Sequence, residues 1–179
     1  MNKMTSLFCS LALSGALLTG CATSAPAVSG APVNADGRWI LLPSINNSET
    51  PQAGGRLDSI TASLLHTHGV SDLGNYPASQ SGDNLFENAD RRGQEAALAW
   101  AMKQDARYAV AGTVEEWRYK VGIDGAPAVG VTLSIIRLDN GKVIWTGSGA
   151  RTGSSREAVS GVAQALVYSL LDQAIHHEN

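Results

Sequence analysis

The chain has 179 residues, with 13 Lys and Arg against 16 Asp and Glu, so its formal net charge at pH 7 is −3. This mild acidity excludes the basic stripe on which nucleic-acid-binding domains depend, while 44% hydrophobic residues are enough for a folded core. Only two cysteines are present, which excludes a disulfide-rich scaffold.

The first residues have the form of a secretory signal. Lys3 precedes the apolar stretch 7–18, which is shorter than the roughly 20 residues that a transmembrane helix needs. The sequence LTGC that follows resembles the bacterial lipoprotein signal, in which the cysteine is lipidated and becomes the first mature residue. We predict a signal peptide at 1–20 and lipidation of Cys21; a buried cysteine after an ordinary signal is the alternative. By the same resemblance, Ala22 favours the outer membrane.

The next stretch, ATSAPAVSGAPVNAD at 22–36, consists mainly of small residues. Such a segment has too little apolar surface to fold by itself. We therefore predict a lipidated flexible tether at 21–37 and a single periplasmic domain at 38–179. A length of about 140 residues is sufficient for one domain with its own core.

The predicted domain opens with a strand and a helix. RWILLPSI at 38–45 has four consecutive apolar residues, which is typical of a strand buried on both faces, and Pro43 ends the run. Apolar residues at helical spacing follow at 57–69, where Gly69 is placed as a C-cap. The stretch GVSDLGNYP holds a short strand at most. A second helix is predicted at 88–103.

Three strand-like runs come next: 106–121, 126–138 and 142–151. Asn140-Gly141 between the last two predicts a hairpin with a type I′ turn, in which both residues have positive φ. Ser154 and Glu157 form a predicted capping box for a final amphipathic helix. The order β-α-(β)-α-β-β-β-α predicts one α+β domain whose C-terminal half is an antiparallel meander.

Two adjacent glutamates, Glu115 and Glu116, stand beside Trp117 in the first of these strands. A sugar-cleaving site needs two carboxylates about 5–10 Å apart around one bond. Successive side chains of a strand point to opposite faces, so Glu115 is expected to share a face with Trp117, and Glu116 to share the other with Arg118. The alternation therefore argues against a catalytic pair and favours a solvated or ion-paired surface for Glu116.

Other catalytic or metal-binding patterns are missing from the sequence. His66 and His68 lie two apart on a predicted helix and so diverge. The cysteine that remains after signal removal is committed to lipid, and no nucleophile elbow or phosphate-binding loop occurs. We expect a protein without enzyme activity, cofactor or metal.

Trp145 lies in the last predicted strand, where Gly147 and Gly149 share its face. An indole suits a membrane–water interface because its ring is apolar and its N–H stays hydrated. In a lipid-anchored protein, Trp145 is therefore a candidate for membrane contact. A core tryptophan packed over glycines explains the same pattern equally well.

Several stretches resemble the PelC family of outer-membrane lipoproteins: LLPSINNSETPQAGGR, GTVEEWRYKVGIDGAPAVGVTL, DNGKVIWTGSGARTG and SREAVSGVAQAL. Together they extend over nearly all of 38–171. The resemblance implies a three-layered domain, similar to those of curli-export and TolB N-terminal proteins. It also implies a non-enzymatic part of the Pel exopolysaccharide export system, which supports the biofilm matrix.

The resemblance further implies partners and residue roles. Family members form a ring homo-oligomer, dodecamer-like, at the periplasmic face of the outer membrane near a PelB-like export β-barrel. An acidic inner surface guides a cationic, partly deacetylated polysaccharide, because ringed carboxylates sum into a negative potential. By this resemblance we expect Asp124, Glu115 and Glu116 in the acidic surface, Trp145 at the membrane rim and Arg151 at a subunit contact.

Two other functions stay open at this point. A lipoprotein of similar fold that activates a peptidoglycan synthase would be a monomer, and its tether would have to cross the cell wall; the segment 22–36 is short for that. A sugar hydrolase would lose its activity on an acid-to-amide change at Glu115 or Glu116.

Overall fold

The structure is a computed structural model that describes residues 26–77, 87–122 and 125–176. The strands of its main sheet are β1 (Ala27–Gly30), β3 (Arg38–Leu41), β4 (Ile45–Asn46), β5 (Asp72–Asn75), β6 (Tyr108–Tyr119), β7 (Pro127–Arg137) and β8 (Lys142–Thr152). The helices are α2 (Ala53–Thr67), α3 (Glu87–Ala101) and α4 (Val159–Ala174). Two short strands, β2 (Val33–Asn34) and β9 (Ile175–His176), pair in parallel beside the main sheet.

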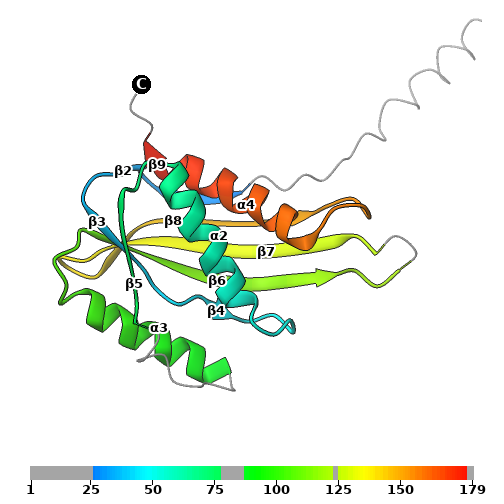
Figure 1. Cartoon of the computed structure of the whole chain (residues 1–179), viewed down its shortest axis with the longest axis horizontal. Helices are drawn as coiled ribbons and strands as arrows, with labels where there is room; N and C mark the ends of the chain where they lie inside the picture. Colours follow the sequence, from blue (N-terminus) through cyan, green and yellow to red (C-terminus); the bar gives the residue numbers. More distant parts are fainter. Residues whose placement is uncertain (1–25, 78–86, 123–124, 177–179) are drawn as a thin grey trace, which may run out of the picture.

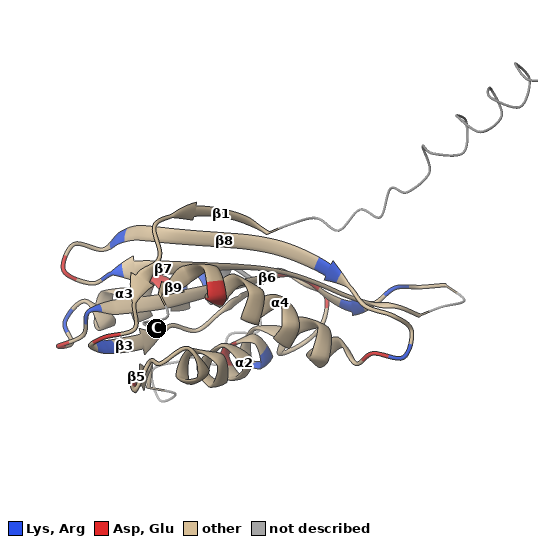
Figure 2. Ribbon diagram, turned by 90° about the horizontal axis from the view of Figure 1, so that it is seen from above, with Lys and Arg blue, Asp and Glu red and all other residues tan. Residues whose placement is uncertain are grey.

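The main sheet is the middle of three layers (Figures 1 and 2). Its strand order is β1-β8-β7-β6-β3-β5, with β4 paired to β6. The strands β5, β3 and β6 run parallel, whereas β6, β7, β8 and β1 are antiparallel. Helices α2 and α4 contact each other on one face, and α3 covers part of the other. The predicted α+β class and element order are confirmed.

Apolar side chains fill the space on both sides of the sheet. Trp39 and Leu41 belong to the larger core under α2 and α4, while Ile40 and Leu42 belong to the smaller core under α3. The prediction of a strand buried on both faces is thus confirmed. The strand is interrupted at Pro43, and the chain then continues as β4, which pairs in parallel with a later part of β6.

The N-terminal boundary of the domain differs from the prediction. Segment 27–30 is not part of a flexible tether: it forms β1 and pairs along the edge of β8. β2 also lies within the predicted tether and pairs with β9 at the end of the chain. The small residues of this segment do not indicate strands, because β1 and β2 form only by pairing with strands more than 100 positions away in the sequence.

Two turns differ in detail from their predictions. The hairpin between β7 and β8 exists, but of its central residues only Gly141 has positive φ, at 67°, so the turn is not type I′. The loop is longer, and Gly141 N–H donates to the Arg137 carbonyl at 2.8 Å. After β8, Glu157 accepts from Ser154 N–H at 2.5 Å, yet α4 begins only after Ala158. The predicted capping box is therefore a separate turn ahead of the helix.

Candidate functional site: an acidic groove beside the long hairpin

A β-bulge at Glu115 sets the direction of both glutamates. β6 and β7 pair in register up to Val114, and the next paired residue is Glu116, which lies opposite Gly130. Glu115 is therefore an extra residue on β6 and interrupts the alternation. As a result, Val114 and Trp117 both point into the core under α2 and α4. The prediction that Glu115 shares a face with Trp117 is wrong.

Both glutamates leave the sheet on the same side. A Cβ added at Gly130 would lie 3.4 Å from the Cβ of Glu116 and 3.7 Å from that of Glu115. The neighbours of Gly130, Val129 and Val131, belong to the core under the helices, so Gly130 faces away from it. Glu115 and Glu116 thus share the surface opposite α2 and α4.

This surface of β6, β7 and β8 continues as a polar area beyond the core under α3. Thr132 donates a hydrogen bond to Ser148 at 3.0 Å, and the hydroxyls of Ser134 and Thr146 lie 3.1 Å apart. These four residues and the two glutamates are called the open face below. Its side chains are small hydroxyls or solvated acids, which leave the sheet accessible to a ligand.

An open groove of about 710 Å³ runs beside the glutamates. It is lined by the loop 47–51 and by strand residues 115–118, so Glu49 joins the two glutamates of β6. The Asn47 amide donates to the Glu115 carboxylate at 3.1 Å. Arg118 also lines the groove, so three carboxylates stand against one guanidinium and the groove is negative overall, which attracts cations without a tight, specific contact.

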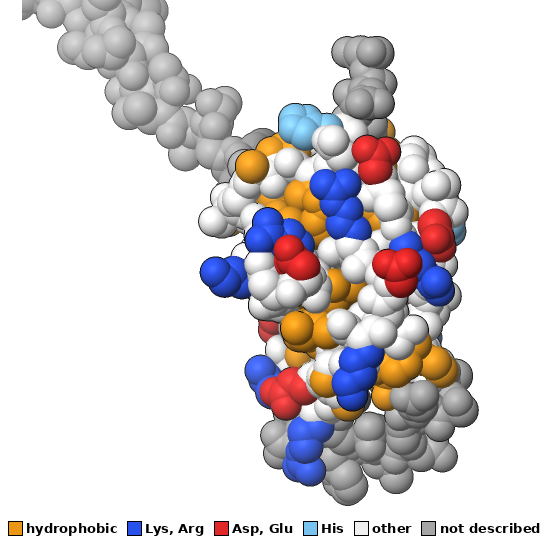
Figure 3. Space-filling model, turned by 90° about the vertical axis from the view of Figure 1, so that its left-hand side faces the viewer, with side chains coloured by type: hydrophobic (Ala, Val, Ile, Leu, Met, Phe, Trp, Pro, Cys, Tyr) orange, Lys and Arg blue, Asp and Glu red, His pale blue; other side chains and the backbone are white. Residues whose placement is uncertain are grey.

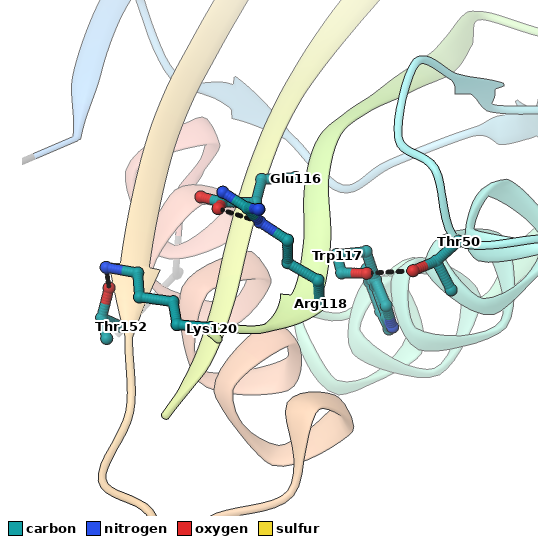
Figure 4. A network of polar contacts seen from close by, with 6 residues as sticks. All are labelled: Thr50, Glu116, Trp117, Arg118, Lys120 and Thr152. Carbon is teal, nitrogen blue, oxygen red and sulfur yellow. Dashed lines mark hydrogen bonds and ion pairs between the residues drawn. The ribbon is translucent and has the colours of Figure 1, made fainter. Parts of the chain in front are cut away.

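Sequence reasoning assigned no role to Glu49 or Asn47. Their loop follows β4, and the parallel pairing of Ile45 with Thr113 of β6 brings it to the bulge. The Thr50 hydroxyl then donates to the Trp117 carbonyl, which fastens the loop to the strand (Figure 4). No local pattern marks such a long-range pairing.

Two basic side chains, Arg118 and Lys120, follow the glutamates in the chain, and Arg118 lines the groove (Figure 4). Arg118 and Glu116 form an ion pair of 2.8 Å, with their side chains 57% and 31% exposed. Lys120 donates to the Thr152 hydroxyl at 3.0 Å. An exposed ion pair contributes only about 0–1 kcal/mol to stability. The pair therefore has little effect on the fold, but it reduces the negative charge at Glu116 and leaves Glu115 and Glu49 as the less compensated acids.

A second groove, of about 590 Å³, adjoins the first at Trp117. It lies between the end of β6, α2 and the first turn of α4. The Tyr119 hydroxyl accepts a hydrogen bond from Val159 N–H at 3.4 Å. Trp117 and Tyr119 thus both lie on the helix side of β6.

The far end of the molecule has a different charge pattern. Figure 3 shows Lys and Arg side chains interspersed with Asp and Glu at the end opposite the β6–β7 hairpin. Arg137 pairs there with Asp139 at 2.9 Å, and Arg38 with Asp72 at 3.8 Å. Charges of both signs compensate each other at this end, whereas in the groove only Glu116 is paired, and Glu115 and Glu49 have no ion pair with a described residue.

Trp145 does not lie at a membrane rim. Its side chain is 1% exposed and belongs to the core under α2 and α4. A Cβ added at Gly147 would come within 2.4 Å of the Trp145 ring, so the ring packs directly over this glycine. The alternative stated from the sequence, a core tryptophan over glycines, is confirmed, and the membrane role of Trp145 is wrong.

The remaining predicted residues fall into two groups. Arg151 is exposed on β8 opposite Val129, where a partner can reach it. It lies near Glu157, whose pKa is lowered first by the backbone N–H of Ser154 and least by Arg151. Cys21 and Asp124 lie outside the described residues.

Among the residues that the structure describes, no three His, Cys, Asp or Glu side chains are placed to hold a metal ion. The described helices include none that is long and apolar enough to cross a membrane. Within the groove, Glu116 is bound to Arg118, and Glu115 is exposed. A general acid of a glycosidase instead needs an apolar surrounding that keeps its carboxyl protonated.

No protein-family model and no curated protein matches the chain. Among solved structures, the lipoprotein GNA1162 of Neisseria meningitidis has the same fold, with a TM-score of 0.56, 21% identity, and coverage of 77% of this chain and 97% of its own. Two structures of the PelC dodecamer from Paraburkholderia phytofirmans are more similar. One is 36% identical with a TM-score of 0.68, over 84% of this chain and 98% of its own. The other is 34% identical with a TM-score of 0.69, over 86% of this chain and all of its own. At this identity and coverage, the chain belongs to the PelC family.

Proposed function

We propose that this protein is a non-enzymatic lipoprotein of Pel exopolysaccharide export, in which the acidic groove guides a cationic polysaccharide toward the export barrel. The observation that carries the proposal is the bulge at Glu115. It turns Glu115 and Glu116 to one side, where Glu49 completes an open groove of three carboxylates. Membership of the PelC family supports the choice of this export system.

The groove is suited to passage rather than to cleavage. A transported chain must be attracted but also released, and solvated carboxylates act on cationic sugars through a screened, non-directional field. Glu115 and Glu49 are exposed, and their attraction therefore weakens with salt. Asp124 stays a proposed member of the same acidic surface.

The assembly is proposed by analogy with the relatives. The similar PelC structures are dodecamers, so we propose a ring homo-oligomer for this chain, with exposed Arg151 as a subunit contact. Lipidated Cys21 would hold the ring at the periplasmic face of the outer membrane, next to the export β-barrel. The alternative, a peptidoglycan-synthase activator, loses support because β1 begins at Ala27 and leaves only 22–26 as a spacer.

A binding experiment tests the groove. Short glucosamine oligomers serve as a cationic probe, and the fully N-acetylated oligomers serve as the neutral counterpart. We expect wild-type protein to bind the cationic oligomers more strongly, and salt to reduce the difference. The double substitution Glu115→Gln and Glu116→Gln should remove most of this preference. The matched control is Asp139→Asn, which removes an acid at the opposite end of the molecule.

The same variants are tested for polymer secretion in cells. Secretion should fall with the double amide variant and with Asp124→Lys, while folding, followed by circular dichroism, stays unchanged. Equal binding of both oligomers by the wild type, or normal secretion by the double variant, would remove the glutamates from the guiding surface. A concentration-independent monomer of the lipidated protein in membranes would contradict the ring.

A further inference from the structure

The second groove, between the end of β6, α2 and the first turn of α4, has no role in the proposed function. Its volume of about 590 Å³ is within the range of about 300–1,000 Å³ that is typical of small-molecule sites. It shares Thr50, Trp117 and Arg118 with the acidic groove. A chain-like ligand that leaves the acidic groove at these residues therefore enters the second groove directly.

The edge of β6 explains why the two grooves are continuous. Pairing between β4 and β6 ends at Val114, and from Glu116 to Tyr119 the only described strand that pairs with β6 is β7. The loop 47–51 lies along this edge in the acidic groove, and α2 lies beside it in the second groove. A ligand can thus pass around the edge from one side of the sheet to the other.

The two grooves differ in charge. The acidic groove has three glutamates against Arg118, whereas the described residues of the second groove include Arg56 and Arg118 and no acid. No described residue forms an ion pair with Arg56. A protonated amino sugar is therefore attracted by the acidic groove and repelled by the second one, while a neutral sugar is not repelled.

The side chains of the second groove suit a neutral sugar that carries an amide. Tyr119 is 54% exposed, so its ring offers an apolar face to a ligand. Its hydroxyl accepts from Val159 N–H at 3.4 Å and keeps its own proton for donation. Ile60 and Val159 add aliphatic surface, and Arg56 adds N–H donors. An N-acetylated sugar matches this lining with its C–H face, its acetyl methyl group and its amide oxygen.

We infer that the second groove binds a neutral, N-acetylated unit of the same polysaccharide whose cationic units are attracted by the acidic groove. The sugar ring packs on Tyr119, and Arg56 discriminates against a protonated amino group. This inference rests on the proposed function of the acidic groove, and it adds a preference for chains that carry both kinds of unit. A fully deacetylated chain gains only from the acidic groove, and a fully acetylated chain gains only from the second.

Glucosamine tetramers that are fully deacetylated, half-acetylated or fully acetylated test this preference. Titration calorimetry with the full lipidated protein in a non-ionic detergent measures their dissociation constants. We expect the half-acetylated tetramer to bind roughly three- to tenfold more tightly than the fully deacetylated one, despite its smaller charge, which is the contribution of one ring contact or one neutral hydrogen bond. Saturation-transfer NMR should show its acetyl methyl protons in contact with the protein.

Three variants locate the preference in the second groove. Tyr119→Ala should remove it and leave the affinity for the fully deacetylated tetramer unchanged. Tyr168→Ala is the matched control, because Tyr168 is a 46% exposed tyrosine of α4 that does not line the groove. Arg56→Glu should also abolish the preference, but by strengthening the binding of the fully deacetylated tetramer. Circular dichroism confirms that each variant is folded.

The outcomes separate this inference from the proposed function. A half-acetylated tetramer that binds no better than the fully deacetylated one would overturn the inference, and so would a preference that persists in Tyr119→Ala. If Tyr119→Ala changes the oligomeric size instead of the preference, a second copy of the chain covers the groove, and the inference is also wrong. The acidic groove is tested by the double variant Glu115→Gln, Glu116→Gln. If that variant binds the fully deacetylated tetramer as tightly as the wild type does, the proposed function fails, whatever the result at Tyr119.

Discussion

The two faces of the strands β6, β7 and β8 differ in the side-chain substitutions that they tolerate. On the helix side, Trp117 and Trp145 are 3% and 1% exposed and are packed among the side chains of one core. On the open face, Glu115 and Thr132 are in contact with solvent. Close-packed interiors respond to the loss or gain of a single methylene group, whereas a solvated surface does not. The same strands therefore hold the fold on one side and are free to carry a charged groove on the other.

The bulge is the point at which the two faces are connected. One additional residue at Glu115 leaves Trp117 on the helix side and adds a second acid to the open face. In a regular strand, the segment after Val114 would have to be one residue shorter to keep Trp117 in the core. The groove thus depends on an insertion that the packed face accommodates without any change in its own residues.

Two deletions of equal length give the largest expected contrast. Deleting Glu115 removes the bulge and keeps Val114 and Trp117 on the helix side, so we expect a folded protein with at most about 1–2 kcal/mol lost. Deleting Thr113 also removes one residue from β6, so Glu116 still pairs with Gly130 and Trp117 with Val129. However, Glu115 then takes the buried position of Val114. An uncompensated buried carboxylate costs roughly 3–5 kcal/mol, in addition to the lost valine contacts.

Urea unfolding followed by circular dichroism measures both variants. The two chains have the same length. They differ at the core position opposite Val131, which holds Val114 or Glu115, and at the preceding position opposite Thr132, which holds Thr113 or Val114. If both deletions destabilise the protein equally, the bulge at Glu115 is not the element that separates the two faces.

The sequence predicts the packed face well. The apolar run at 38–45, the β7–β8 hairpin and the final helix each have a periodic pattern that burial imposes, and all are present in the structure. The ends of the elements are predicted less accurately: the last helix begins after Ala158 rather than at the Ser154–Glu157 pair. Patterning that arises from a common core can be predicted without knowledge of the partners.

The candidate site is predicted only in part. Glu115 and Glu116 are found because they are adjacent acids beside an aromatic, but their shared direction depends on a bulge that no residue type marks. Glu49 reaches the site because β4, which precedes its loop, pairs with β6. The strand β1 forms because it pairs with β8. Both pairings are long-range. Trp145 has the same local sequence whether it packs in a core or at a membrane, and only the position of α4 decides between the two.

Trp145 and Thr146 are adjacent residues of β8 that point to opposite faces of the sheet, and their substitution should have very different costs. Trp145→Ala removes a fully buried ring from over Gly147, and we expect a loss of about 3–5 kcal/mol. Thr146→Ala removes a hydroxyl of the open face, and we expect a loss below about 1 kcal/mol. Thermal and urea unfolding of the two variants measures the difference. A stable Trp145→Ala protein with weaker membrane binding would restore the membrane role that its burial contradicts.

The smallest of the expected contrasts is a pH-dependent change in stability, which comes from one ionisable group on the helix side. Asp58 lies on α2 and accepts a hydrogen bond from Ser44 N–H at 3.1 Å. Burial raises its pKa to about 6 from the usual 3.8, although the hydrogen bonds from Ser44 act in the opposite direction. An acid whose pKa is higher in the folded state gives a stability that is complete below about pH 4 and is lost as the pH rises through about 6.

We therefore expect Asp58→Asn to match the wild type near pH 4 and to be more stable at pH 7.5. A shift of about two pKa units corresponds to about 3 kcal/mol as an upper limit, and relaxation around the charge should reduce this to about 1–2 kcal/mol. The amide oxygen that this substitution introduces can still accept the Ser44 N–H, so the loop before β4 keeps its contact with α2. Melting temperatures of both proteins between pH 4 and pH 8 measure the effect, with Asp139→Asn as the exposed control that should change little. A variant that is less stable than the wild type at pH 7.5 would show that the hydrogen bonds of the ionised carboxylate outweigh its burial. In that case, the helix side tolerates charge as well as the open face does, and the contrast between the two faces would be limited to their apolar packing.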